Sequence, residues 1–74
     1  MIWENNPAEV MHKAQGKKGK YTIFELSASI CAKEYSEPCF RCRLWDAESG
    51  YVLWETKETT LEVAKKMCEE HDEN

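Results

Sequence analysis

A chain of 74 residues and 8.7 kDa forms a single small domain, because so short a chain buries only about 60% of its unfolded surface. Hydrophobic residues make up 42% of it, including three Trp, three Tyr and two Phe, which excludes the disordered class. Ten basic and fourteen acidic residues give a net charge of −4, which excludes a protein that binds nucleic acid over its whole surface.

Residues 6–15 carry the signals of a short helix. Asn6 can cap it, and Pro7 suits the first helical position, where no N–H is needed. Gly16 and Gly19 are expected to end it. An apolar stripe at helical spacing lies between these signals and consists of Val10, Met11 and Ala14.

Three segments then alternate with the two-residue period of β-strands. They are Tyr21–Ile30, Cys39–Trp45 and Tyr51–Thr56. Pro38 ends the loop before the second segment, and Asp46–Gly50 predicts a hairpin loop before the third. In the second segment, one face carries Phe40, Cys42 and Leu44, and the other carries Cys39, Arg41, Arg43 and Trp45.

A C-terminal helix is predicted by the Thr-x-x-Glu capping box that runs from Thr59 to Glu62. Its apolar stripe consists of Leu61, Ala64, Met67, Cys68 and His71. Residues 72–74 are expected to be a frayed tail. The sequence therefore predicts one α+β domain over residues 1–74: a short N-terminal helix, a three-stranded antiparallel β-meander and a C-terminal helix, in the order α-β-β-β-α.

Charge is unevenly distributed along the chain. Residues 1–43 carry a net charge of +2 and residues 44–74 a net charge of −6. Four lysines surround the Gly16–Gly19 segment, and they either solvate a loop or bind phosphates: Lys13, Lys17, Lys18 and Lys20.

The α-β-β-β-α order resembles the double-stranded-RNA-binding domain. The matching positions are Pro7, Met11, Tyr21, Phe40 and Ala64-Lys65, whereas Leu61 and Glu62 stand where that family has phosphate-binding lysines. The segment from Thr60 to Lys65 is also similar to the last helix of small accessory proteins of phages and mobile elements. These resemblances imply RNA binding in the first case and inhibition of a host protein by binding alone in the second.

The cysteine spacing allows a zinc site. The chain contains C-x2-C followed by C-x2-H, a ligand set suited to tetrahedral zinc, formed by Cys39, Cys42, Cys68 and His71. No leader places the chain in an oxidising compartment, so we expect reduced thiols, a cytoplasmic location and no contact with a membrane. The alternative to zinc is that these thiols are buried and inert, with no cofactor.

No motif supplies a nucleophile with an oriented base, so an enzyme is not expected. Basic and aromatic residues instead form a candidate binding face of Arg41, Arg43 and Trp45, with Tyr51 or Trp54 beside them. The first hypothesis is therefore a non-enzymatic, acidic protein-binding module, of which a phage-type inhibitor is one form. The alternatives are a nucleic-acid-binding domain and a structural zinc module, and a homodimer through the same face is allowed.

Overall fold

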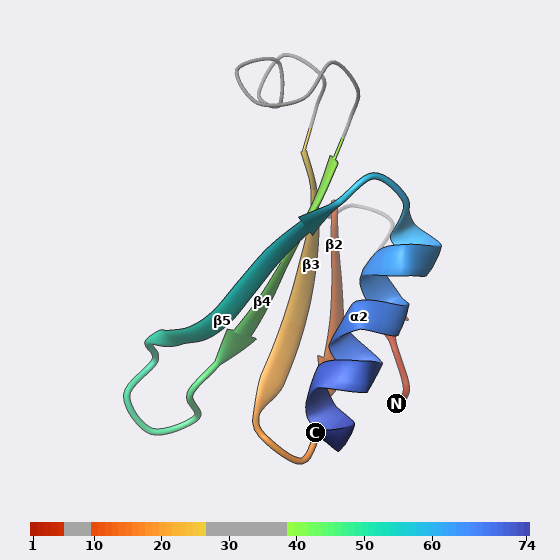
Figure 1. The fold of residues 1–74 in the computed structure, drawn as a ribbon. Coiled ribbons are helices and arrows are strands. Elements are labelled where there is room, and N and C mark those ends of the chain that lie inside the picture. The colour runs from red at the N-terminus through yellow and green to blue at the C-terminus, as the bar shows by residue number, and fades with distance from the viewer. Residues whose placement is uncertain (6–9, 27–38) are drawn as a thin grey trace.

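A computed structural model describes residues 1–5, 10–26 and 39–74 and contains one antiparallel sheet and one helix (Figure 1). The five strands follow the sheet in chain order, from β1 at one edge to β5 at the other. Their bounds are β1 Glu4–Asn5, β2 Met11–Gln15, β3 Lys20–Leu26, β4 Cys39–Trp45 and β5 Val52–Glu58, and the helix is α2 Leu61–Glu73. No helix in these residues is long and apolar enough to span a membrane.

The predicted N-terminal helix is wrong where the structure describes it, because Met11–Gln15 forms β2. His12 and Ala14 are buried and alternate with more exposed neighbours, as expected for a strand rather than a helix. The cause is tertiary, since β2 pairs with β3 across a tight turn in which the N–H of Gly16 donates to the carbonyl of Gly19 at 2.9 Å. The predicted helix start, residues 6–9, lies outside the described residues.

The α-β-β-β-α prediction is therefore overturned by a five-stranded sheet with one C-terminal helix. The three predicted strands nevertheless overlap three of the observed strands. The first predicted strand overlaps β3, and its later part lies outside the described residues. The second matches β4, and the third overlaps β5. The hairpin loop between them is closed by hydrogen bonds between Asp46 and both Gly50 and Tyr51.

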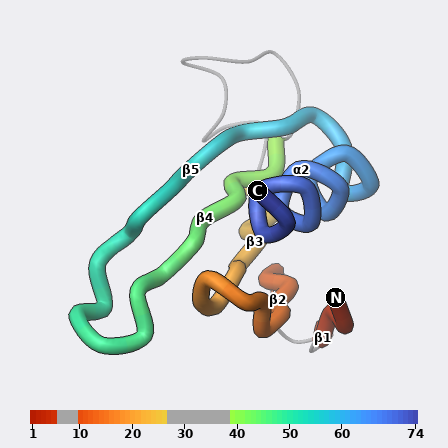
Figure 2. The backbone as a smooth tube through the Cα atoms, turned by 60° about the horizontal axis from the view of Figure 1, so that its bottom comes forward, coloured from red at the N-terminus to blue at the C-terminus, as the bar shows by residue number. Residues whose placement is uncertain are grey.

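Helix α2 packs on one face of the sheet, and Figure 2 shows the sheet curving around it. The core between them combines strand residues Tyr21, Ile23, Cys42 and Leu44 with helix residues Ala64 and Cys68. The helix stripe read from the sequence is thus correct at its two buried positions. Thr60, one residue after the predicted cap, accepts a hydrogen bond from the N–H of Val63 and begins the helix.

The far end of α2 is held against the β2–β3 turn. The Asp72 carboxylate accepts hydrogen bonds from the backbone N–H groups of Lys17 and Lys18, each at 3.0 Å. We call this contact the Asp72 turn cap. Helix α2 extends through Glu73, in the region where fraying was expected. At the same end of the helix, the indole N–H of Trp3 donates to Glu69 at 3.2 Å, so α2 also holds the N-terminal segment.

Candidate functional site

The face of the sheet opposite α2 carries the candidate site. Residues that pair across antiparallel strands project from the same face, so the register assigns each side chain to one side. We call this side the open face, because no helix of the described chain covers it (Figure 1). Its polar and aromatic residues are Glu4, Lys13, Gln15, Lys20, Thr22, Phe24, Arg41, Arg43, Trp45, Glu55 and Lys57.

Two arginines of β4 share one carboxylate of β5 at the centre of this face. The Nε atom of Arg43 donates to Oε1 of Glu55 at 2.9 Å, and the Nε atom of Arg41 lies 3.3 Å from the same oxygen. The Nε atom of Arg41 is buried and makes no hydrogen bond to the described residues, so its contact with Glu55 is an ion pair without a directed hydrogen bond. Two guanidinium charges meet one carboxylate, and the cluster keeps a net positive charge.

Trp45 is fixed beside the arginine pair. Its indole N–H donates to the hydroxyl of Thr22 on β3 at 2.8 Å, which fixes the position of the ring on the open face. The guanidinium carbon of Arg43 lies 5.8 Å from the ring centroid, within the range of a cation–π contact. The arrangement provides an aromatic ring held in place by the sheet and flanked by positive charge.

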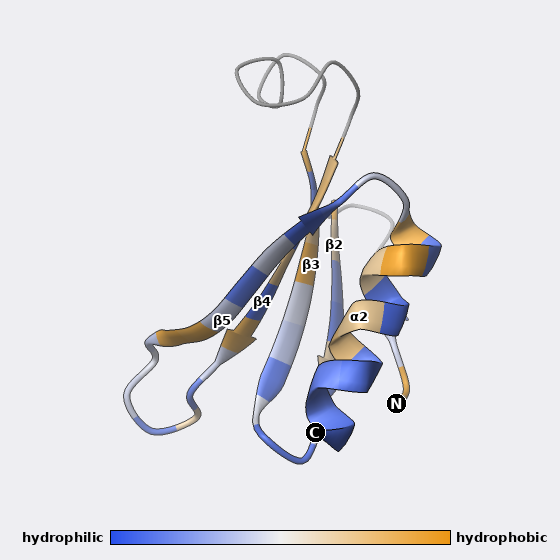
Figure 3. Cartoon of the chain, viewed as in Figure 1, coloured by the Kyte–Doolittle hydropathy of each residue, from blue (hydrophilic) through white to orange (hydrophobic). Residues whose placement is uncertain are grey.

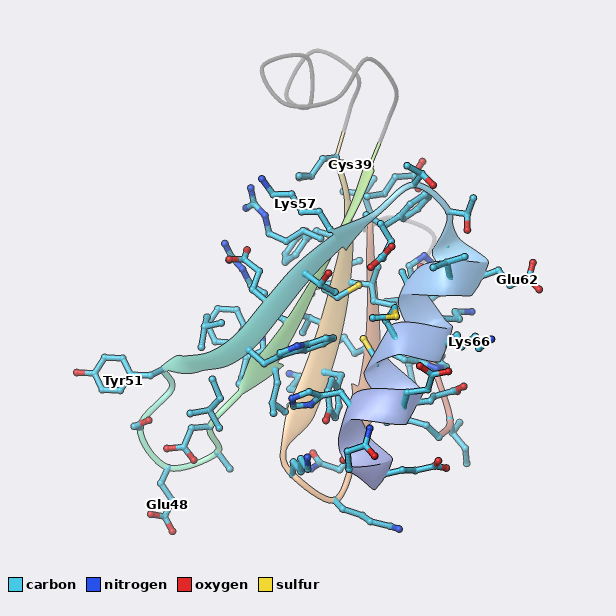
Figure 4. All side chains as sticks on the ribbon, in the orientation of Figure 1. Cys39, Glu48, Tyr51, Lys57, Glu62 and Lys66 are labelled. Carbon is cyan, nitrogen blue, oxygen red and sulfur yellow. The ribbon has the colours of Figure 1, made fainter. Side chains whose placement is uncertain are left out.

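Five basic side chains belong to the open face, against the carboxylates of Glu4 and Glu55. Helix α2, on the opposite side of the sheet, carries five acidic residues and two lysines. Figure 4 shows Lys57 pointing away from α2 and Glu62 projecting from the helix into solvent. The net charge of −4 therefore conceals a basic face.

A shallow hollow of about 750 Å³ adjoins the basic residues of β2 and β3. It is lined by two lysines, one glutamate and four uncharged residues: Lys13, Lys20, Glu4, Met1, Ile2, Ala14 and Gln15. The hollow extends the open face beyond Trp45, because Gln15, Lys20 and Trp45 are successive cross-strand neighbours.

The five residues predicted to form a partner-binding face do not all lie together. Arg41, Arg43 and Trp45 share the open face, as the strand alternation indicated. Trp54 pairs with Leu44 on the opposite face, where its ring stacks on His71 with centroids 4.3 Å apart. Tyr51 lies in the β4–β5 loop and is 74% exposed.

The four lysines of the predicted phosphate-binding segment also separate into two pairs. Lys13 and Lys20 lie on the open face, each in a strand that borders the turn. Lys17 and Lys18 belong to the turn itself and supply the N–H groups of the Asp72 turn cap. The N–H of Lys17, and then that of Lys18, lower the pKa of Asp72 by stabilising its charged form.

The four residues of the predicted zinc site do not converge. Within residues 1–5, 10–26 and 39–74, no group of three or more His, Cys, Asp or Glu side chains is arranged to hold a metal ion. Cys39 is disulfide-bonded and offers no thiolate, so the expectation of reduced thiols is wrong at this position. Cys42 and Cys68 are free thiols in the core, where their mutual hydrogen bond and burial raise the pKa of Cys42.

His71, the fourth of those residues, takes part in packing. Its Nδ1 atom lies 3.0 Å from the hydroxyl of Tyr21, and burial lowers its pKa, so the ring is neutral at pH 7. Burial and the nearby Asp72 raise the pKa of Tyr21 to about 12, which keeps its hydroxyl protonated. These groups hold the end of α2 against β3 and β5.

Residues of the site that were not predicted from the sequence include Thr22, Phe24, Glu55 and Lys57. Phe24, Arg41 and Lys57 form one cross-strand row, and Thr22, Arg43 and Glu55 form the next. The available signal was the alternation of Trp54, Glu55 and Thr56 at the end of the third predicted strand, continued by Lys57 just after it, but only the register reveals which face each residue occupies.

Comparison with known proteins gives no relative: no family model, no curated protein and no solved structure matches this chain.

Proposed function

We propose that this protein is a binding protein whose open face binds single-stranded nucleic acid. One observation carries the proposal. Lys13 and Lys20, which the sequence connected with phosphate binding, lie on the same face as Arg41, Arg43 and Trp45, which the sequence connected with partner binding.

The chemistry of the face matches the two parts of a nucleotide. Lysine and arginine side chains attract the phosphate backbone, and an aromatic ring provides a surface on which a base can stack. Trp45 lies between cationic neighbours, with Lys20 directly across the ladder and Arg43 over its ring. A single-stranded nucleic acid that lies across the sheet would thus contact the Trp45 ring with a base and the cationic side chains with its phosphates.

A single strand suits this face better than a duplex. Bases in a duplex are stacked on one another, and their faces are not available to a protein ring. The acidic helix on the other side of the sheet repels the backbone, so attraction is confined to one side of the molecule.

Binding is measured by fluorescence anisotropy of a labelled oligothymidylate and a labelled oligouridylate at low salt. The Trp45→Ala variant should bind about 5- to 150-fold more weakly, since stacking on an aromatic side chain contributes about 1–3 kcal/mol per base. Tyr51→Ala is the matched control, because it removes an exposed aromatic ring that lies in the β4–β5 loop. A melting curve for each variant serves to check that the fold is retained.

Salt dependence tests the lysines separately. Each phosphate contact with a single strand contributes about −0.7 to the slope of log K against log salt. Lys13→Gln and Lys20→Gln should each make the slope less steep by about that amount.

Several outcomes would contradict the proposal. Equal affinity for duplex RNA would favour the double-stranded alternative. Absence of binding to any oligonucleotide at low salt would refute nucleic-acid binding. Binding to an acidic protein in its place, weakened by Trp45→Ala, would assign the open face to the protein partner that composition first indicated.

A further inference from the structure

Strand β5 is the edge of the sheet in the described chain, and its first residues are exposed and apolar. Val52 is 41% exposed and Leu53 is 57% exposed, and both follow the exposed Tyr51. Figure 3 shows this apolar stretch where β5 leaves the hairpin, away from α2. Soluble proteins usually protect an edge strand with charges, bulges or a covering element, because its backbone groups can pair with another strand.

Charged residues do occupy the later part of β5, and they restrict which strand can pair there. Glu55 and Lys57 project from the open face and are separated by Thr56. We propose that the strand that pairs with this edge is β5 of a second copy of the chain, antiparallel about a two-fold axis through Thr56.

The charge pattern selects that register. With Thr56 opposite its own copy, Glu55 of each chain lies opposite Lys57 of the other, and the dimer gains two pairs of unlike charge. A two-residue slip in one direction places Glu55 opposite Glu55, and the same slip in the other direction places Lys57 opposite Lys57. A one-residue slip would bring side chains of opposite faces together. The edge is therefore complementary to itself in one register.

Glu55 can contact the two arginines of its own chain and Lys57 of the second copy at the same time. Both arginines contact its Oε1 atom, and a carboxylate has a second oxygen that can accept from an ammonium group. The two-fold axis is normal to the sheet, so the helices of both copies lie on one face. Figure 2 shows α2 on the inner side of β5, and no strand or helix of the described residues lies along its outer edge.

The same register also covers exposed apolar residues. With Thr56 opposite its own copy, Leu53 lies opposite Thr59 and Val52 opposite Thr60, so the hairpin end of β5 in each copy lies near the start of α2 in the other. Pairing along β5 would cover part of the exposed apolar surface of Val52 and Leu53, which adds a hydrophobic contribution to the ladder.

The interface does not depend on the function of the open face. If the proposed function is correct, the dimer has a consequence for it, because two open faces become one continuous basic surface with Trp45 in two symmetric positions.

The test is the mass of the protein in solution, measured by sedimentation equilibrium over a wide range of concentration, without nucleic acid. We expect a species of twice 8.7 kDa. Lys57→Glu should weaken the dimer about tenfold or more, because it places like charges opposite each other twice. The double variant Glu55→Lys with Lys57→Glu should restore the dimer, since it exchanges the two charges. Lys66→Glu, on the outer side of α2, makes the same charge change away from the edge and should have no effect.

Three results would overturn the interface. They are a monomer at every concentration, a dimer that Lys57→Glu leaves unchanged, and a monomeric double variant that remains folded by circular dichroism. Because mass is measured without nucleic acid, failure of the dimer and failure of nucleic-acid binding are separate results.

Discussion

Replacing Asp72, in the last turn of α2, by alanine should destabilise the fold. Its carboxylate accepts hydrogen bonds from the N–H groups of Lys17 and Lys18, more than fifty residues away in sequence. The contact is close, because a Cβ atom on Gly16 would lie 2.6 Å from Oδ1 of Asp72. The Asp72 turn cap therefore joins the C-terminal end of α2 to the β2–β3 turn.

The magnitude follows from the two bonds. A hydrogen bond to a charged group contributes about 1.5–3 kcal/mol, and both bonds here are solvent-exposed, so we expect about 1–2 kcal/mol in total for Asp72→Ala. In a domain of this size, each kcal/mol corresponds to about 4–8 °C in Tm. The control is Glu73→Ala, which removes the same charge from the adjacent position and should change Tm little.

The pH dependence distinguishes this cap from a general effect of charge. The folded-state pKa of Asp72 is lowered, so its contribution is present above the unfolded pKa of about 4 and is lost as the pH falls through the folded pKa. Urea denaturation should thus separate wild type from Asp72→Ala at pH 7 and bring them together in acid. Equal stability at pH 7, or a difference that persists in acid, would refute the reasoning.

Three further predictions follow from buried groups and strained backbone. Burial and then the charge of Lys18 lower the pKa of His71. The neutral His71 ring therefore contributes its full stabilisation above about pH 6.5, and this contribution declines in more acidic solution. An NMR titration that gives His71 a pKa above about 6.5 would contradict this prediction. Cys42 and Cys68 are fully buried, so both should resist a thiol reagent until urea unfolds the protein, and rapid modification of native protein would show that the core is open. Gly19→Ala should lower Tm more than Gly50→Ala, because both glycines have positive φ but only the first would place a Cβ 2.5 Å from a backbone carbonyl.

Local patterns identified much of the C-terminal half. The alternation of Phe40, Cys42 and Leu44 with the arginines placed β4 and assigned its two faces correctly, because side chains of a strand point alternately to either side. The stripe that includes Ala64 and Cys68 likewise identified the buried side of α2. These signals are local and need no knowledge of neighbouring strands.

The N-terminal half depended on contacts that the sequence does not display. Met11–Gln15 has apolar spacing compatible with a helix, but pairing with β3 makes it a strand and buries His12 and Ala14 on the side of the sheet that carries α2. The same pairing brings Lys13 onto the face of Arg43.

The site itself was therefore divided by sequence reasoning and assembled only by the fold. Residue types and alternation determined that Arg41, Arg43 and Trp45 share one side of a strand. The register of five strands decided that the lysines of β2 and β3 join them and that Trp54 faces the core, because a face of a sheet is defined by pairing between segments distant in sequence.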